Sequence, residues 1–492
     1  MTDPLAVLSI AAAAGGGRVD AHDAAHLVAA GHTLLRRSAP LVRALQGRRS
    51  AILLPTSSAF LVALAASDGR GAVLINPLAA PAEIAHQLRD ADVGAVLTVG
   101  ALAGRLPDGT PHVLLDAAPA AARVVLDGAP TDVDLTVHRG DALDLVGSTD
   151  ADGLDEEAAI VYTSAMAGTP LGAIATHRNL VSNARATIEA ARLTPADHAL
   201  AVLPYSHLFG LVVSGLAPLL AGARVTTMER FNPLRAVEAL ESEAITLLVG
   251  VPAVFAALLQ ALERRGGRLR SEALRVSICG GAPLPVELQA RWAEATGGEL
   301  RQGYGLTEAG PVCLFNDVAL PNRLGTMGVP FPGVAVEIHD PASGARLPAG
   351  RVGEICVRGP NVGPGYVRHG ERGLARRGGW LHTGDLGVEN ADGTITFRGL
   401  LKPMFTRNGF NIYPRELEQT LLAMPGVQGA RVRGVPDPVR EHDIVVEVVG
   451  AVSAEAVKRW CAERLSAYKQ PSEVTVTAPE GAGAGATLTP GG

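Results

Sequence analysis

The chain has 492 residues, of which 19% are charged, and its formal net charge is -6. A chain of this length is too long for one compact core, so two or more domains are expected. The slightly negative net charge argues against nucleic acid or an anionic membrane as a partner and favours small molecules as partners.

Cysteine spacing and hydropathy argue against further classes of protein. The cysteines lie far apart, at positions 279, 313, 356 and 461, and no two have a metal-ligand spacing. A disulfide framework or a zinc site is therefore not expected. This use of cysteine is consistent with a protein of the reducing cytoplasm. The most apolar run, residues 208–223, is short and interrupted by Gly and Pro, so it predicts a buried helix and not a membrane span.

Short apolar runs alternate with Ala/Leu-rich stretches of helical period, a pattern typical of doubly wound α/β sheets. The runs are residues 51–55, 72–76, 95–98, 112–116, 244–250 and 274–280. Residues 334–338, 353–357 and 394–397 are expected to be strands of a turn-rich β module, because Gly and Pro punctuate them. We therefore expect one large N-terminal domain, residues 1–400, that combines doubly wound sheets with this β module.

The pattern changes after Gly399. The expected order is then helix, strand, strand and helix, which predicts a small mobile α+β domain over residues 403–492, with a hinge near Lys402 and Pro403. These elements are residues 415–422, 429–434, 443–449 and 454–465. The Gly/Ala-rich residues 480–492 are expected to form a mobile tail.

One short loop, residues 301–308, reads Arg-Gln-Gly-Tyr-Gly-Leu-Thr-Glu and combines flexible glycines, an aromatic ring, a hydroxyl and a carboxylate. Tyr304 can stack on a purine, Thr307 can donate a hydrogen bond to an α-phosphate, and Glu308 can hold magnesium against the phosphates. The two glycines that flank the tyrosine are Gly303 and Gly305. These residue types suit a loop that binds a nucleotide together with its magnesium ion.

Two further segments offer nucleotide contacts. Residues 382–387 read His-Thr-Gly-Asp-Leu-Gly, and the carboxylate of Asp385 is a strong hydrogen-bond acceptor. The small residues Gly281, Ala282 and Pro283 follow an apparent strand and would let a flat adenine ring approach the backbone. A solvated turn aspartate and an ordinary Gly-rich strand-to-helix turn are the alternatives.

Together these segments resemble the nucleotide-binding segments of the adenylate-forming superfamily, and most closely those of acyl-CoA synthetases such as 4-coumarate-CoA ligases. The resemblance extends over roughly residues 30–475 and implies an ATP-dependent, AMP-forming ligase in which Asp385 accepts hydrogen bonds from the ribose hydroxyls. Such an enzyme joins an acid to AMP, releases pyrophosphate, and passes the acyl group to an acceptor, most commonly coenzyme A. By the same resemblance, the acid pocket is lined by His207, Phe209, Val251, Cys279 and Gly280. Each of these is, taken singly, more often an ordinary core residue.

The chain departs from the family in its phosphate loop. The family has a Ser/Thr/Gly-rich loop with a lysine near its end, and here the matching residues 162–172 carry Leu171 in place of the lysine. Fewer hydroxyl groups are left to wrap the phosphates. The candidate phosphate ligands that remain are Thr163, Ser164, Gly168 and Thr169.

The domain junction and the C-terminus also depart from the family. Leu400 stands where the family has a ribose-clasping arginine, and Arg398 is the candidate to replace it. Lysine occurs only at positions 402, 458 and 469, so Lys402 is the candidate catalytic cation at the junction. Pro403 restricts the hinge torsion, and residues 487–492 lack the lysine that the family uses during adenylation.

Three functions stay open on this evidence. The first is a working acyl-CoA ligase-like enzyme that uses ATP, Mg²⁺ and coenzyme A. The second is a variant without a thioester step, either a nitrite-activating diazotase that acts on an aryl amine or an amide-forming ligase. The third is a degenerate protein that only binds AMP. The expected partners are a small acid or anion and an acceptor, coenzyme A or an amine; a homodimer is left open.

Overall fold

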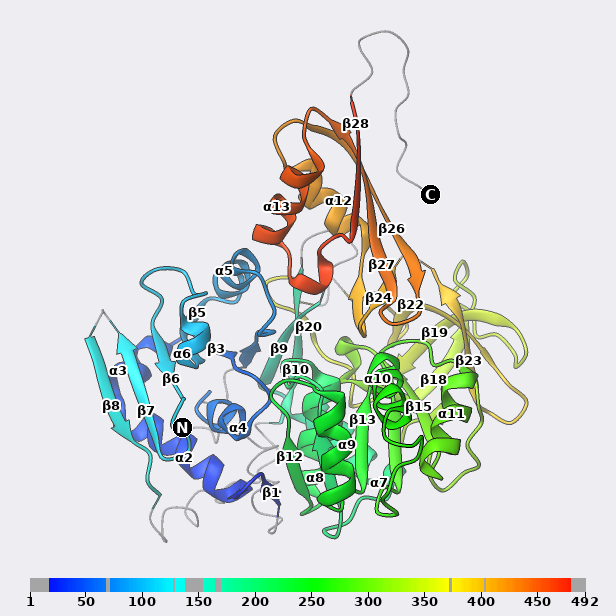
Figure 1. Ribbon diagram of the computed structural model, residues 1–492, viewed down its shortest axis with the longest axis horizontal. Helices are drawn as coiled ribbons and strands as arrows, with labels where there is room; N and C mark the ends of the chain where they lie inside the picture. The colour runs from blue at the N-terminus through cyan, green and yellow to red at the C-terminus, as the bar shows by residue number, and fades with distance from the viewer. Residues whose placement is uncertain are drawn as a thin grey trace.

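The computed structural model describes residues 17–67, 71–126, 129–137, 154–163, 170–370, 374–401 and 404–478. Two nine-stranded sheets and a five-stranded sheet form a large lobe, and residues 404–478 form a small lobe that stands above it in Figure 1. Within the described ranges, no helix has the length and apolar character that crossing a membrane requires. The α/β fold class expected from the sequence is confirmed.

The first nine-stranded sheet has a parallel centre and antiparallel edges. Its strands are β3 (Arg49–Leu53), β4 (Ala72–Leu74), β5 (Val93–Thr98), β6 (His112–Leu114), β7 (Ala121–Leu126), β8 (Ala129–Asp134), β9 (Glu157–Thr163), β10 (Leu171–Thr176) and β20 (Gly365–Tyr366). The spatial order is β20-β10-β9-β4-β3-β5-β6-β7-β8. Alternate side chains enter different cores: Ile52 joins the main core, whereas Ala51 and Leu53 join a second one. This burial on both faces explains the unbroken apolar runs.

The second nine-stranded sheet reverses its strand order at the centre. Its strands are β1 (Arg18–Val19), β2 (His22–Asp23), β11 (His198–Ala201), β12 (Arg224–Thr227), β13 (Leu247–Gly250), β14 (Val276–Cys279), β15 (Leu300–Gly305), β16 (Val312–Phe315) and β17 (Val329–Pro330). The order is β17-β16-β15-β14-β13-β11-β12-β1-β2, so β11 pairs in parallel with both β12 and β13. Ligands bind at such a switch point, beyond the carboxyl ends of the strands.

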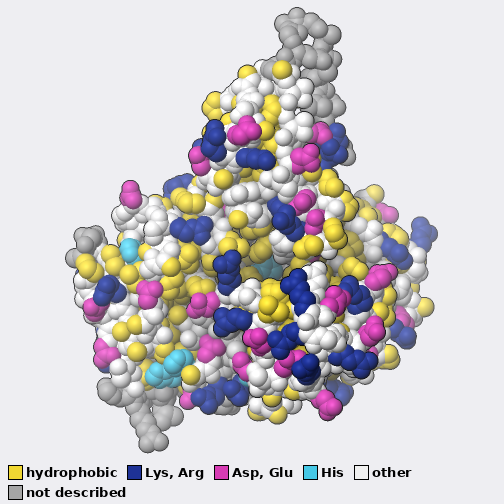
Figure 2. All heavy atoms as spheres, in the orientation of Figure 1, with side chains coloured by type: hydrophobic (Ala, Val, Ile, Leu, Met, Phe, Trp, Pro, Cys, Tyr) yellow, Lys and Arg dark blue, Asp and Glu magenta, His cyan; other side chains and the backbone are white. Residues whose placement is uncertain are grey.

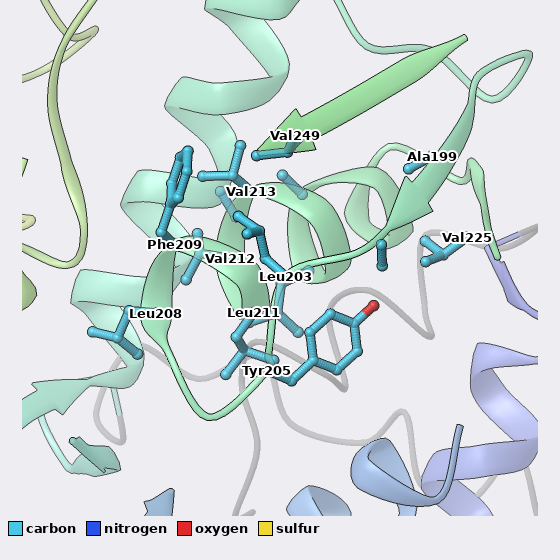
Figure 3. Close-up of a cluster of buried hydrophobic side chains, with 14 of the residues drawn as sticks. Ala199, Leu203, Tyr205, Leu208, Phe209, Leu211, Val212, Val213, Val225 and Val249 are labelled. Atoms are coloured by element: carbon cyan, nitrogen blue, oxygen red, sulfur yellow. The ribbon is translucent and has the colours of Figure 1, made fainter. Parts of the chain in front are cut away.

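Helices fill the space around these sheets (Figure 1). In the large lobe they are α2 (Ala24–Arg37), α3 (Ala39–Leu45), α4 (Ser58–Ala65), α5 (Pro81–Asp90), α6 (Gly100–Ala103), α7 (His177–Ala191), α8 (Ala217–Leu220), α9 (Pro233–Ser242), α10 (Pro252–Glu263) and α11 (Val286–Thr296). The apolar run 208–223 forms a π-helix, η3 (Phe209–Leu216), continued by α8. All eight residues of η3 are buried, among side chains such as Leu203 and Tyr205 (Figure 3), so the predicted buried helix is confirmed.

The β module is an antiparallel five-stranded sheet. Its strands are β18 (Ala335–His339), β19 (Val352–Arg358), β21 (Arg376–Arg377), β22 (Trp380–Glu389) and β23 (Ile395–Leu400). One face carries Ile338, Ile355 and Leu381, which join the main core of the large lobe. This face therefore fixes β22, which carries Asp385, against the rest of the large lobe.

The small lobe has a hydrophobic core of its own, built around Leu417, Ile444 and Val457. Its elements are β24 (Phe405–Arg407), β25 (Phe410–Ile412), α12 (Pro414–Leu422), β26 (Val427–Asp437), β27 (Glu441–Gly450), α13 (Ala454–Arg464), η6 (Ala467–Lys469) and β28 (Glu473–Thr477). The four elements expected from the sequence are present as α12, β26, β27 and α13. The sequence analysis missed the β24–β25 hairpin and β28.

Candidate active site

Glu308 lies where three segments of the large lobe meet. It belongs to a short 3₁₀ turn, η4 (Thr307–Ala309), that follows β15. Its Oε1 accepts hydrogen bonds from the Tyr366 hydroxyl at 2.7 Å and from the Thr163 hydroxyl at 3.4 Å. Burial and the charge of Glu308 raise the pKa of Tyr366, so this hydroxyl stays a proton donor at neutral pH. Two hydroxyl groups thus orient the carboxylate.

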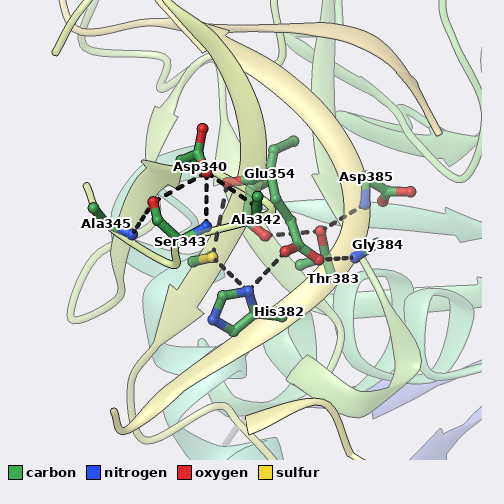
Figure 4. A network of polar contacts seen from close by, with 11 residues as sticks. Asp340, Ala342, Ser343, Ala345, Glu354, His382, Thr383, Gly384 and Asp385 are labelled. Carbon is green, nitrogen blue, oxygen red and sulfur yellow. Dashed lines mark hydrogen bonds and ion pairs between the residues drawn. The ribbon is translucent and has the colours of Figure 1, made fainter. Parts of the chain in front are cut away.

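Asp385 lies on β22, and its Oδ2 accepts a hydrogen bond of 2.6 Å from the Tyr304 hydroxyl. The backbone N–H of Asp385 donates to the hydroxyl of Thr383 at 3.1 Å (Figure 4). Burial raises the pKa of Asp385 to about 6, the charges of Glu354 and Glu308 add to the rise, and the hydrogen bond from Tyr304 opposes it. Asp385 is therefore mostly ionised at neutral pH and becomes neutral in mild acid.

The expected acid pocket lies beyond the carboxyl ends of neighbouring parallel strands. His207 and Phe209 follow β11, and Val251 follows β13. At the end of β14, a side chain on Gly280 would lie 3.0 Å from the Phe209 ring, so the glycine permits a close approach. The structure thus brings these predicted residues to the switch point of the second sheet.

His207 is neutral at physiological pH, because burial lowers its pKa to about 4. Its Nδ1 accepts a hydrogen bond of 3.2 Å from the backbone N–H of Phe209. The proton of the neutral ring therefore sits on Nε2, which makes this nitrogen a donor.

A narrow apolar cavity of about 10 Å³ lies behind Phe209. Its lining residues are Thr187, Ala191, Phe209, Val213, Ile278, Gly303, Val312, Phe315 and Phe331. This volume holds about one water molecule, so side chains must move to admit a larger group. The chemistry of the lining favours an apolar guest.

The small lobe reaches over the pocket through the β24–β25 hairpin. Its turn residue Gly409 has φ of +77°, and a side chain there would lie 2.6 Å from Val251 Cγ1. Glu441 holds the turn by accepting a hydrogen bond of 3.2 Å from the Gly409 N–H. Basic side chains surround the hollow where the two lobes meet on the face shown in Figure 2. The site is therefore composed from both lobes.

A buried ion cluster ties the small lobe to the large one. Lys469 Nζ lies 3.1 Å from Glu83 Oε1 on α5 and 2.6 Å from Glu416 Oε1 on α12. The Ser466 hydroxyl also donates to Glu83. Lys469 thus pairs with two carboxylates, and the three side chains together hold the observed orientation of the lobes.

The structure does not test every predicted site residue. Ser164, Gly168, Thr169 and Lys402 lie outside the described residues, as does the tail 480–492. Arg398 is exposed on β23. Leu400 is the residue directly opposite Asp385 in the β22–β23 ladder.

Three residues of the site were not predicted from the sequence. Tyr366 and Glu441 hold Glu308 and Gly409, as described above. Burial raises the pKa of Tyr413, and the charges of Glu308 and Asp385 add to the rise, so both carboxylates act on its hydroxyl. Tyr366 and Tyr413 fall in segments that resemble the family, but their partners lie far away in sequence and only the fold reveals them.

Comparisons with known proteins agree with this geometry. The family model described as "AMP-binding enzyme" matches residues 37–367, and the "AMP-binding enzyme C-terminal domain" matches residues 416–480. A feruloyl-CoA synthase from Amycolatopsis sp is 34% identical over 469 residues, which cover 90% of this chain and 89% of that protein.

Two solved structures extend the similarity over the whole fold. A malonyl-CoA ligase with methylmalonyl-CoA and AMP bound is 29% identical with a TM-score of 0.76, covering 95% of this chain and 96% of that one. An amide bond synthetase from Marinactinospora thermotolerans is 27% identical with a TM-score of 0.77, covering 96% and 95%. This chain belongs to the AMP-binding enzyme family and is an ATP-dependent, AMP-forming ligase of the acyl-CoA synthetase type.

Proposed function

We propose that the chain activates a compact, apolar carboxylic acid with MgATP and transfers the acyl group to coenzyme A. The observation that carries the proposal is the pair of carboxylates, Glu308 and Asp385, held by Tyr366 and Tyr304 in one site. The proposal includes the division into a large domain, residues 1–400, and a small mobile one, residues 403–492.

The donor set at Glu308 fits magnesium. Mg²⁺ binds oxygen ligands and takes one or two carboxylates together with substrate phosphates. The hydroxyls of Tyr366 and Thr163 both hydrogen-bond to Oε1, and no described residue hydrogen-bonds to Oε2. We assign Oε2 to the magnesium of MgATP. The phosphates would be held by Thr163, Ser164, Gly168, Thr169 and Thr307.

We assign the nucleoside part of ATP to the second carboxylate, Asp385. The Oδ2 of Asp385 is held by Tyr304, so Oδ1 is the oxygen that would accept the ribose hydroxyls. Arg398 is the candidate for a second ribose contact. The adenine ring would lie between Tyr304 and the small residues Gly281, Ala282 and Pro283, with Gly303 and Gly305 leaving room beside the tyrosine.

The residues support two successive substitutions. In the first, a carboxylate oxygen of the acid attacks the α-phosphorus and pyrophosphate leaves with its bonding electron pair. Thr307 donates a hydrogen bond to the α-phosphate, and Lys402 balances the charge that develops there. In the second, the thiol sulfur of coenzyme A attacks the acyl carbon, AMP leaves, and the thiol proton passes to solvent.

The pocket chemistry favours an aromatic acid. The cavity beyond His207, Val251, Cys279 and Gly280 is lined by Phe209, Phe315 and Phe331, and none of its lining residues carries a charge. A second carboxylate, as in malonate, would be buried there without a counter-charge, which is unfavourable. Ring-on-ring packing instead suits an aryl group.

Amide formation is the second candidate. The observation that favours it is the similarity over the whole fold to an amide bond synthetase, which is nearly as strong as that to the CoA ligase. The two functions share the adenylation step and differ only in the nucleophile that attacks the acyl carbon.

One experiment separates these functions. Purified protein is incubated with MgATP and a panel of aryl and alkyl acids, and pyrophosphate release and products are measured with coenzyme A or with amines as acceptors. Thioester formation supports the proposal, and amide formation supports the second candidate. Nitrite with an aryl amine tests the diazotase hypothesis. AMP binding without pyrophosphate release under any condition would show a degenerate protein and would contradict the proposal.

A further inference from the structure

We propose that His339, Cys356 and His382 form a binding site for a zinc-type divalent transition metal ion, with Glu354 as the adjoining carboxylate. One ligand atom from each of the three side chains lies within 4.8 Å of the other two. The site is separate from the proposed magnesium position and does not depend on the proposed function.

Strand register explains why distant residues meet here. Cys356 on β19 lies opposite His382 on β22, and His339 on β18 lies opposite Glu354 on β19. Residues two positions apart in a strand share one face, so these side chains project from the same side of the sheet. The other side carries the apolar residues that join the main core.

The separation between the candidate donors matches a metal site. Cys356 Sγ lies 3.4 Å from His382 Nδ1. Zinc–sulfur and zinc–nitrogen bonds of about 2.3 and 2.0 Å in a tetrahedral arrangement place the two donor atoms about 3.5 Å apart. Cys356 and His382 would therefore need little movement to receive an ion.

His339 supplies the most specific indication of a metal site. Its Nε2 lies 2.9 Å from Glu337 Oε2, whereas its Nδ1 is buried and has no hydrogen-bond partner among the described residues. A ligating histidine commonly donates its second N–H to a carboxylate, which fixes the ring and leaves the other nitrogen for the metal. Glu337 and His339 show this arrangement.

Burial and charge favour a cation in the same place. His339, Cys356 and His382 are 6%, 0% and 7% exposed, and Glu354 is 7% exposed. Two imidazoles, a thiol and a nearby carboxylate match the ligand preference of Zn²⁺ and differ from the all-oxygen preference of Mg²⁺. The His382 Nδ1–Glu354 Oε2 contact of 2.7 Å is a hydrogen bond that an ion would replace, with Glu354 then completing the coordination.

The site adjoins the nucleotide crevice through the backbone. Glu354 Oε1 accepts a hydrogen bond of 2.9 Å from the N–H of Gly384, the residue before Asp385. An ion that immobilises Glu354 and His382 would therefore also fix the segment that presents Asp385. The cysteine spacing gave no sign of the site, because its ligands come from three strands and include only one cysteine.

The test uses tag-free full-length protein, stripped with a chelator and then titrated with Co²⁺ or Zn²⁺ alone. The expected result is one ion per chain, a tetrahedral Co²⁺ spectrum with a thiolate-to-cobalt charge-transfer band, and a rise in Tm with Zn²⁺. His339→Phe keeps a ring of similar size against Trp380, and Cys356→Ala removes the thiolate. Both variants should lose the band and the Tm rise.

Matched controls are His369→Gln, an exposed histidine, and Cys461→Ala, a buried cysteine of the small lobe, and both should retain the signals. Absence of the charge-transfer band in the wild-type protein would overturn the proposal. Persistence of the band in Cys356→Ala would overturn it equally. If His339→Phe does not fold, the wild-type and Cys356→Ala spectra still decide.

Discussion

The proposed acid pocket and the proposed nucleotide crevice are built on different physical principles. The pocket is made by the ends of parallel strands and has an uncharged lining. Its side chains pack so closely that the cavity measures only about 10 Å³. The crevice is made by the η4 turn and strand β22, and its key groups are the carboxylates Glu308 and Asp385, each held by a tyrosine hydroxyl. The pocket is suited to select the acid by shape, and the crevice to handle charge whichever acid is bound.

This difference predicts two classes of variant. A change in the crevice should affect all acids by the same factor, because every acid uses the same nucleotide. A change in the pocket should alter the ranking of acids and leave nucleotide binding unchanged.

Glu308→Gln is expected to have the largest effect. Removing the charge that is proposed to hold magnesium should lower pyrophosphate release by about 100-fold or more, equally for every acid that the wild-type protein accepts. The measurement is pyrophosphate release at saturating MgATP, with Glu294→Gln, an exposed glutamate on α11, as the control. Unchanged release in Glu308→Gln would remove the proposed metal role.

Asp385 should make nucleotide binding depend on pH. Because the pKa of Asp385 is about 6, the carboxylate that is proposed to accept the ribose hydroxyls is lost as pH falls below that value. ATP affinity is expected to fall by up to about tenfold per pH unit below pH 6. In Asp385→Asn, affinity should be weak and independent of pH over this range. A wild-type affinity that stays flat across pH 6 would contradict the role of Asp385.

The same residue should lower the stability of the fold at neutral pH. The pKa of Asp385 in the folded state lies above its ordinary value of 3.8. The stability that protonated Asp385 contributes to the fold is therefore fully present below about pH 4 and is lost as pH rises through about 6. The loss in the free energy of unfolding is at most about 3 kcal/mol. Asp385→Asn can still accept the Tyr304 hydrogen bond, so its Tm should exceed the wild-type Tm at pH 7 and match it near pH 4.

The sequence predicted the parts of the site that lie within one segment. The loop 301–308 was singled out by its residue types and its resemblance to the family. The structure places its Tyr304 against Asp385 and its Glu308 against Tyr366, and the nucleotide and magnesium contacts of these residues stay predictions. Contacts that depend on packing between distant segments were not predictable. Tyr366 meets Glu308 only because β20 pairs with β10, and Gly409 covers Val251 only because the small lobe docks there.

Tyr366→Phe should have an intermediate effect in the crevice. The substitution removes the hydroxyl that lies 2.7 Å from Glu308 Oε1 and leaves the ring in place. A hydrogen bond to a charged group contributes about 1.5 to 3 kcal/mol, so a loss of about tenfold or more in kcat/KM is expected for every acid. Tyr468→Phe, in the small lobe, is the control. A loss confined to some acids would place Tyr366 in the pocket instead.

Gly280→Ala should have the smallest effect and the most selective one. The added methyl group would lie 3.0 Å from the Phe209 ring and 3.3 Å from the Gly303 carbonyl oxygen, so the ring must shift into the pocket. The measurement is kcat/KM for a series of acids of increasing ring substitution, with ATP affinity measured in parallel. Bulky acids are expected to lose about 10-fold against small ones, because one methyl group in a pocket changes discrimination by about 1 to 3 kcal/mol. An equal loss for all acids would mean that Gly280 belongs to the crevice, and the separation between the two regions would fail at this residue.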